Sequence, residues 1–205
     1  MLRTSERGTL KKCEFLWDLT YNKRLKPLTE MPALRFGSLA HQALAGYYIP
    51  GVKRGQHPAI GFEKAYEADA KQNSELFGMR IDEEERWVNA LELGVSMMNN
   101  YVDEYGADDE WEVLATEMPF RMLVQRDGEP WFWYTGIIDG AWRNRRSKEV
   151  WIPDHKTTAG IGDRKLQYLQ VDDQAGMYWS YGVEFLRSVG LVKPNQNMLV
   201  VLYNF

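Results

Sequence analysis

The spacing of apolar residues changes near Trp111, and this change limits the folds that the chain can adopt. Before it, apolar side chains recur every three to four positions, the spacing of one helix face. After it, β-branched and aromatic residues form runs that favour strands. We therefore expect a helical region over about residues 1–110. The apolar positions are Phe36, Ala40, Leu44 and Tyr47 in one stretch, and Trp87, Leu91, Val95, Met98 and Val102 in another.

The region after Trp111 predicts an order of elements. Asp127-Gly128, between the first two apolar runs, is a hairpin signal. A helix is expected over about Leu166–Arg187, and Met198–Leu202 has the composition of a buried strand. Helices, three strands, one helix and one strand together predict an α/β fold. The three strands are expected at Trp111–Val124, Trp131–Arg143 and Val150–Pro153.

The chain is long enough for one sizeable core, with 205 residues of which 44% are hydrophobic. We expect residues 1–205 to form a single domain, with a helical part over about 1–110 and a catalytic core over about 111–205. No run of 18 apolar residues and no secretory signal occurs, so we expect a cytoplasmic protein without a membrane segment. Because the last predicted strand ends so near Phe205, we expect the natural chain to continue.

The net charge of −4 is unevenly distributed. Residues 63–112 hold 15 of the 29 acidic residues but only 4 of the 25 basic ones. The remainder of the chain is therefore basic, and contacts with phosphate are compatible with the acidic average. Cys13 is the only cysteine, so the chain cannot build an internal disulfide or a four-cysteine metal site.

Three acid-x-Lys triplets occur, and their context distinguishes them. Only Asp154 and Lys156 directly follow a short apolar strand, where residues two apart can point to the same side. A carboxylate and an ammonium would then share one site. The other two triplets have the polar surroundings of a surface. The triplets are Asp69-Ala70-Lys71, Asp154-His155-Lys156 and Asp163-Arg164-Lys165.

A second carboxylate, Asp139, ends the run Tyr134–Ile138 on the strand expected beside that of Asp154. Carboxylates on adjacent strands can approach one ion. Mg²⁺ prefers oxygen ligands and retains waters, whereas Mn²⁺ also accepts an imidazole. Taken alone, Asp139 is equally well interpreted as a turn residue.

Four segments of the chain, taken in order, resemble motifs of RecB-type exonucleases in the PD-(D/E)XK nuclease superfamily. This group includes the nuclease domains of RecB and AddB and the CRISPR-associated adaptation exonucleases. The resemblance implies a restriction-endonuclease-like core, with a central mixed β-sheet flanked by helices and a helical N-terminal region. The segments are Phe36-Gly37-Ser38-Leu39-Ala40-His41, Gly136-Ile137-Ile138-Asp139, Ile152-Pro153-Asp154-His155-Lys156-Thr157-Thr158 and Gln174-Ala175-Gly176-Met177-Tyr178.

The resemblance implies a role for each residue of these motifs. Asp139 and Asp154 would hold Mg²⁺ or Mn²⁺, with the backbone carbonyl of His155 as a further ligand. His41 would add a nitrogen ligand, although a helix histidine is more often structural. Lys156 would position the attacking water and stabilise charge on the phosphate. The side chain of His155 occupies the variable position of its motif, and we expect it to point away from the metal.

Three further residues are weaker candidates. Gln174 and Tyr178 are four apart and share a helix face, and the resemblance makes them DNA-binding or site-supporting groups. Glu117 matches an acid on the first strand of the family, although an edge-strand glutamate needs no function. Some relatives hold an iron–sulfur cluster through one early and three late cysteines. Cys13 matches the early one, but its partners are absent from these 205 residues. We therefore expect no such cluster; the alternative is that the partners lie beyond Phe205.

These observations predict a Mg²⁺- or Mn²⁺-dependent DNA exonuclease of recombination or repair, encoded by a bacterium or a phage. A helicase or a recombination protein is a conceivable partner. The alternative is a catalytically silent module that binds DNA or a helicase; loss of Asp139, Asp154 or Lys156 would mark it, and all three are present. An unrelated metal hydrolase would need more histidines than His41, His57 and His155.

Overall fold

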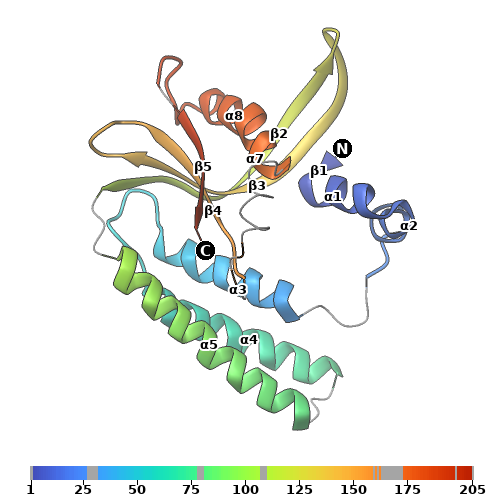
Figure 1. Cartoon of the computed structure of the whole chain (residues 1–205), viewed down its shortest axis with the longest axis vertical. Helices are drawn as coiled ribbons and strands as arrows, with labels where there is room; N and C mark the ends of the chain where they lie inside the picture. The colour runs from blue at the N-terminus through green and yellow to red at the C-terminus, as the bar shows by residue number, and fades with distance from the viewer. Residues whose placement is uncertain are drawn as a thin grey trace.

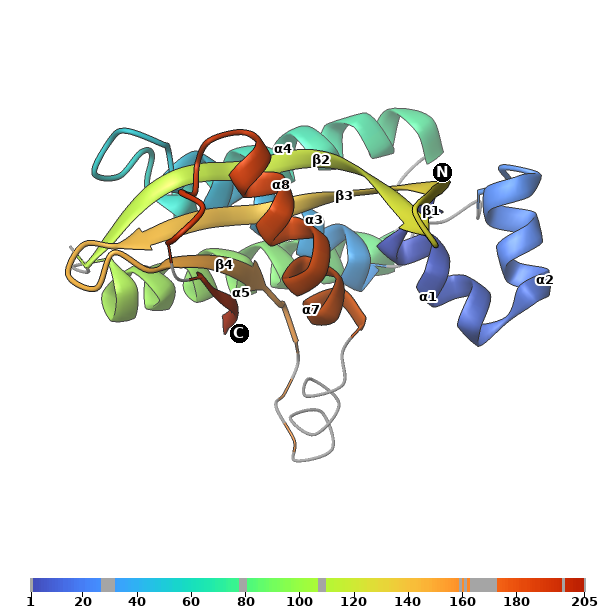
Figure 2. The same ribbon diagram turned by 90° about the horizontal axis from the view of Figure 1, so that it is seen from above.

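A mixed β-sheet with helices on both faces forms the body of the protein (Figure 1). The structure is a computed structural model. On one side of the sheet lie three long helices, and on the other lies a shorter helical segment near the C-terminus (Figures 1 and 2). The predicted α/β fold is thereby confirmed. The structure describes residues 2–26, 32–77, 81–106, 110–158, 160, 162, 173–196 and 198–204.

Strand β3 (Glu129–Asn144) is the centre of the sheet, and β2 (Trp111–Arg126) runs antiparallel to it along its whole length. Asp127 and Gly128 join them, both with positive φ, as a two-residue hairpin turn requires. The predicted hairpin is therefore confirmed. On its other edge, β3 pairs with two strands at different points along its length.

The strands on that other edge make the sheet mixed. Near its C-terminal end β3 pairs antiparallel with β4 (Val150–His155), and β4 pairs in parallel with β5 (Met198–Asn204). Nearer the hairpin tip, β3 pairs in parallel with β1 (Leu2–Arg3). The sequence did not predict β1, because two residues are too few to carry a strand pattern.

Helices α3 (Pro32–Tyr47), α4 (Pro58–Phe77) and α5 (Ile81–Tyr105) form the larger helical layer. The predicted apolar positions pack together there and meet the sheet through Val113 and Trp142, except for Trp87, whose side chain lies outside the described residues. Burial of these apolar faces is the main stabilising term for the layer. Its core includes Ala40, Leu44, Tyr47, Phe62 and Met98, with Phe36, Leu91, Val95 and Val102 packed against it.

The opposite face of the sheet is covered by α7 (Asp173–Met177), η2 (Tyr178–Gly182) and α8 (Val183–Ser188). These agree with the last part of the helix predicted over 166–187, although η2 is one turn of π-helix. The predicted start of that helix lies outside the described residues. The core on this face includes Phe120, Tyr134, Ile138, Ile152 and Leu186.

The N-terminal segment α1 (Thr4–Lys12), α2 (Glu14–Trp17) and η1 (Asp18–Asn22) follows β1. None of its side chains is buried, and the Thr4 hydroxyl meets the Tyr134 hydroxyl of the sheet. Cys13 is exposed, and its sulfur accepts a hydrogen bond from the backbone of Leu16. Within the described residues, every helix is too short or too polar to cross a lipid bilayer.

Candidate active site

A histidine and two carboxylates from three different elements converge beside the sheet. His41 comes from α3, Glu117 from β2 and Asp139 from β3, and one candidate ligand atom from each lies within 4.8 Å of the others. His41 Nδ1 is 3.5 Å from Glu117 Oε1 and 3.4 Å from Asp139 Oδ2. One imidazole nitrogen and two carboxylates at this spacing could hold a metal ion. We call these three residues the ligand cluster.

The hairpin register positions Glu117 in this cluster. Thr116 pairs with Gly140 and Met118 with Ile138, so Glu117 lies opposite Asp139. Glu117 has a φ of 46°, a left-handed conformation that non-glycine residues rarely adopt. Such strain occurs most often at functional sites, where surrounding structure maintains it. Glu117, a weak candidate from the sequence, thus lies within the cluster.

His41 connects α3 to the end of β4. Its Nε2 lies 2.9 Å from the carbonyl oxygen of His155, so Nε2–H donates there while Nδ1 faces the carboxylates. The hydrogen bond to Glu117 and the nearby charge of Asp139 raise the pKa of His41, against the effect of its burial. The carbonyl expected to serve as a metal ligand therefore lies beside His41.

Asp139 bridges two strands with its side chain. Strands β3 and β4 pair at Trp142–Trp151 and Arg143–Val150, and beyond these pairs the backbone N–H of His155 donates instead to Asp139 Oδ2, at 2.9 Å. Burial raises the pKa of the Asp139 carboxyl to about 6, and the charge of Asp154 acts in the same direction, whereas His41 opposes it. A buried carboxylate beside other acids is stabilised by a cation.

Asp154 lies in a second group of side chains, next to the first. Only 1% of its surface is exposed, and its Oδ2 is 2.7 Å from Lys156 Nζ. Gln174 joins both residues: its amide nitrogen donates to Asp154 Oδ1 at 3.1 Å, and its amide oxygen accepts from Lys156 at 2.8 Å. Asp154 and Lys156 therefore lie close together, as the sequence predicted. Gln174 bonds to both of them, and we call these three residues the lysine group.

Tyr178 anchors this group to the central strand. Its hydroxyl accepts from the Gln174 amide at 2.8 Å and donates to the carbonyl of Ile137 at 3.0 Å. Burial raises the pKa of Tyr178, so the phenol stays protonated. The helical spacing that put Gln174 and Tyr178 on one face therefore brings both into the site.

The side chain of His155 packs into an aromatic cluster and lies edge-on to the ring of His41, at 6.1 Å between centroids. Its ring is buried among Tyr48, Tyr101 and Trp142, stacked on Tyr48 at 6.1 Å between centroids. Burial lowers its pKa to about 3, so the ring is neutral at physiological pH. His155 thus contributes packing through its ring and polar contacts through its backbone.

Two glycines permit the close approaches that assemble the site. A Cβ on Gly140 would lie 2.8 Å from Pro153 Cγ, where β3 passes β4. A Cβ on Gly37 would lie 3.1 Å from Thr157 Oγ1, where α3 meets the segment after β4. Both contacts are tighter than a side chain normally accepts, so these glycines keep the elements that carry Asp139, Asp154 and His41 close.

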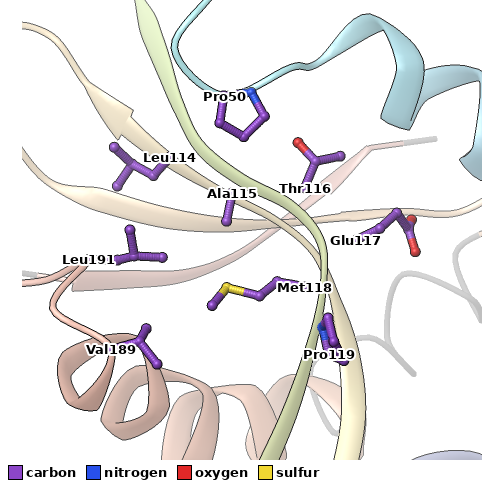
Figure 3. Close-up of a pocket in the computed structure, with 9 residues that line it drawn as sticks. All are labelled: Pro50, Leu114, Ala115, Thr116, Glu117, Met118, Pro119, Val189 and Leu191. Carbon is purple, nitrogen blue, oxygen red and sulfur yellow. The ribbon is translucent and has the colours of Figure 1, made fainter.

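A cleft of about 410 Å³ lies beside the ligand cluster, on the edge of β2 that pairs with no other described strand. Its lining is mostly apolar, with Leu114, Met118 and Leu191 among the residues shown in Figure 3. Glu117 stands at one side, with its carboxylate directed away from Met118 (Figure 3). The cleft therefore adjoins the ligand cluster through Glu117.

Asp69-Ala70-Lys71, another acid-x-Lys triplet, lies on α4 away from the site. Asp69 forms an ion pair with the guanidinium of Arg35 on α3, consistent with a structural role. The triplet Asp163-Arg164-Lys165 lies outside the described residues.

Carboxylates, a histidine and a lysine lie together where β3 and β4 separate. These are the side chains of a metal-assisted hydrolase site. A family model of the PD-(D/E)XK nuclease superfamily matches residues 5–181. The chain therefore belongs to the PD-(D/E)XK nuclease superfamily, which implies a metal-dependent nuclease with DNA as its substrate. The superfamily predicted from the sequence is thus confirmed. A search of curated proteins gave no match.

Proposed function

We propose that this protein is a Mg²⁺- or Mn²⁺-dependent DNA exonuclease that acts in recombination or repair. The observation that carries the proposal is the ligand cluster of His41, Glu117 and Asp139 next to the pair of Asp154 and Lys156. Exonuclease action is supported by the four ordered segments that resemble RecB-type exonucleases. By the same resemblance, we propose a bacterial or phage protein that works in the cytoplasm, with a helicase or recombination protein as partner.

The donor set fits a divalent ion. We propose that Asp139, Asp154, His41 and the carbonyl of His155 hold it, with Glu117 as an additional carboxylate. Oxygen donors suit Mg²⁺, and the imidazole makes Mn²⁺ an equally good occupant. The raised pKa of Asp139, about 6, is consistent with a carboxylate that lacks a neutralising charge. When bound, the ion would polarise the phosphate and lower the pKa of a water.

Lys156 gives the site a positive charge that comes from a side chain and not from a bound ion. Its ammonium is held by Asp154 Oδ2 and by the amide oxygen of Gln174, two acceptors that fix its direction. Its side chain is 30% exposed, so a substrate could reach it. We propose that Lys156 orients the attacking water and stabilises the charge that develops on the phosphate oxygens.

The proposed reaction is hydrolysis of a phosphodiester. The oxygen of water forms a bond to phosphorus while one ester bond from phosphorus to sugar oxygen breaks. Water loses a proton, and the leaving oxygen gains one, giving a terminal phosphate and a hydroxyl. Lys156 is near enough to the buried Asp154 to pass or hold a proton at its Nζ atom.

The test uses purified protein with end-labelled single-stranded and double-stranded DNA in Mg²⁺, Mn²⁺ or EDTA. A covalently closed single-stranded circle separates exonuclease from endonuclease action, because it has no end. Lys156→Ala is expected to abolish shortening of the linear DNA, whereas Lys193→Ala, a change at an exposed lysine, is the matched control. Intact DNA under every condition would contradict the proposal and favour a silent DNA-binding module.

A further inference from the structure

The backbone of His155 holds two of the three residues of the ligand cluster. Its N–H donates to Asp139 Oδ2 at 2.9 Å, and its carbonyl oxygen accepts from His41 Nε2 at 2.9 Å. Its neighbours Asp154 and Lys156 both contact α7 through their side chains. Because side chains alternate along a strand, that of His155 points to the opposite face, where the larger helical layer packs.

The sheet supports this backbone from one side. Among the described residues, β4 pairs with β3 through Val150 and Trp151 at its start, and His155 lies beyond that pairing. On the other side of β4, His155 lies opposite Asn204 of β5. Two features could therefore fix the N–H and carbonyl of His155 toward the ligand cluster: the pairing with β5 and the packing of its own ring.

Aromatic rings from three elements pack around the ring of His155, which is only 8% exposed. Tyr48, directly after α3, stacks on it, and Trp142 of β3 lies at 5.8 Å between centroids. Tyr101 of α5 and His41 of α3 both meet it edge-on, at 6.1 Å. We call Tyr48, Tyr101 and Trp142 the aromatic box.

Hydrogen bonds fix the walls of the aromatic box. The hydroxyls of Tyr48 and Tyr101 lie 2.8 Å apart, which joins α5 to the end of α3. The carbonyl of Tyr48 accepts from the hydroxyl of Thr116 on β2, next to Glu117. Tyr48 and Trp142 are each 4% exposed. The box is therefore a well-packed frame that connects the helical layer to the sheet at the ligand cluster.

Packing holds the ring of His155 in this frame. Its Nδ1 atom is buried and, within the described part of the chain, has no hydrogen-bond partner. A buried polar atom without a partner destabilises a fold, so the benefit of this side chain comes from its flat ring and not from that nitrogen. A cavity of about 10 Å³, lined in part by His41, Tyr48 and His155, leaves space for a slightly larger ring.

We propose that His155 is a positioning residue for the ligand cluster. The aromatic box holds its ring, and the held ring fixes the backbone N–H and carbonyl that orient Asp139 and His41. Loss of a group that orients metal ligands typically lowers metal affinity by about 10–100-fold. The expected effect on metal affinity rests on the proposed function, whereas the orientation of His41 does not.

The first test needs no metal. The chain has three histidines, so ¹⁵N-histidine labelling leaves only His41 and His57 visible in variants at position 155. In EDTA at pH 9, the ring proton of His41 is expected on Nε2 in the unmodified protein and in His155→Phe, because the carbonyl of residue 155 accepts from it. In His155→Ala a mixture of both tautomers is expected, since Nδ1 of His41 faces two carboxylates.

The second test measures the Kd for Mn²⁺ by isothermal titration without DNA. His155→Ala is expected to raise this Kd about ten-fold or more, and His155→Phe to keep it close to that of the unmodified protein. Tyr101→Ala, which opens the box from α5, should give a smaller rise. Leu186→Ala is the control, because it removes a fully buried side chain on the opposite face of the sheet. It should lower the melting temperature and leave the Kd unchanged.

The outcomes separate this inference from the proposed function. An unchanged His41 tautomer in His155→Ala would overturn the positioning role, and the pairing with β5 would then be enough to fix the backbone. Equal losses in His155→Phe and His155→Ala would also overturn it, because the nitrogen and not the shape of the ring would be needed. A His41 tautomer that depends on a ring at position 155, in a chain that binds no Mn²⁺ and cleaves no DNA, would uphold the positioning role and overturn the proposed function.

Discussion

Two aspartates on adjacent strands of this protein lie in opposite electrostatic surroundings. Asp139 faces Glu117 and His41, and burial raises its pKa to about 6. Asp154 is more deeply buried, yet Lys156 and Gln174 supply it with an ammonium and an amide N–H. The backbone of His155 joins the two, because its N–H donates to Asp139.

The two aspartates therefore differ in how their negative charges are balanced. Asp154 has a neutralising charge within the chain, so the lysine group can be stable without any ligand. Among the described residues, the cationic partner of Asp139 is the titratable His41, which it shares with Glu117. The ligand cluster therefore depends on an added cation, while the lysine group does not. Changes at Asp139, Asp154 and Tyr178, together with the pH dependence of metal binding, can test this division.

Asp139→Asn is expected to lower DNA cleavage about a thousand-fold or more, because one metal carboxylate is lost. The same variant should unfold less readily than the unmodified protein in EDTA at pH 8. The folded pKa of Asp139, about 6, exceeds the ordinary 3.8, so its stabilising contribution is lost as pH rises through 6. Asparagine does not ionise, so the variant should gain up to about 3 kcal/mol in the free energy of unfolding at pH 8. Urea unfolding at pH 8 and pH 4 measures this gain in the free energy of unfolding, which should vanish at pH 4.

Asp154→Asn should instead reduce the free energy of unfolding in EDTA, by about 1–3 kcal/mol, because Lys156 loses its partner. This figure is below that of a fully buried pair, since the Lys156 side chain is 30% exposed. Urea unfolding at pH 8 measures it beside Asp139→Asn. The double change Asp154→Asn with Lys156→Met should recover part of the loss. A stabilised Asp154→Asn variant would refute the proposed contrast.

Metal affinity is expected to fall at low pH, because ligands must be deprotonated to bind. With the pKa of Asp139 at about 6, the Kd for Mn²⁺ should rise about ten-fold for each pH unit below 6. The raised pKa of His41 extends the decline toward neutral pH. Isothermal titration from pH 5 to 8 measures this without DNA. A Kd independent of pH, or equal in Asp139→Asn, would show that the ion binds elsewhere.

Tyr178→Phe is expected to have the smallest effect, about 1 kcal/mol of stability and less than a ten-fold loss of cleavage. The change removes the hydroxyl that joins Gln174 to the carbonyl of Ile137. Thermal melting and the cleavage assay measure it, and Tyr181→Phe in the same helical turn is the matched control. Equal behaviour of both variants would mean that the hydroxyl does not support the lysine group.

Much of the fold followed from local patterns that need no tertiary context. The positions at helical spacing in α3 and α5 pack in one core, and Asp127-Gly128 forms the predicted turn. Strand β1 was missed, because its pairing partner at Tyr134 is far away in the sequence and nothing local marks it. The one-turn π-helices were missed as well, since their extra residue leaves no periodic signal.

The site was predicted in part. Asp154 and Lys156 come together because strand alternation is a local rule, and Asp139 lies on the predicted neighbouring strand. The position of Glu117 depends on the hairpin register and on a backbone conformation that the residue type disfavours. The ring of Gln174, Asp154 and Lys156 depends on how α7 docks on the sheet. Such packing is not encoded in any short stretch of sequence.

The alternation of β3 has a consequence for changes in hairpin length. Trp133 shares a face with Asp139 only because an even number of positions separates them and no register shift lies between them. One residue inserted between Thr135 and Ile137 would turn Trp133 toward the core side and expose Tyr134 instead. Two inserted residues would restore the face and lengthen the surface by about 7 Å. Related chains should therefore differ from this one by even numbers of residues between Trp133 and Asp139, unless a β-bulge like that at Trp131 takes up the odd residue.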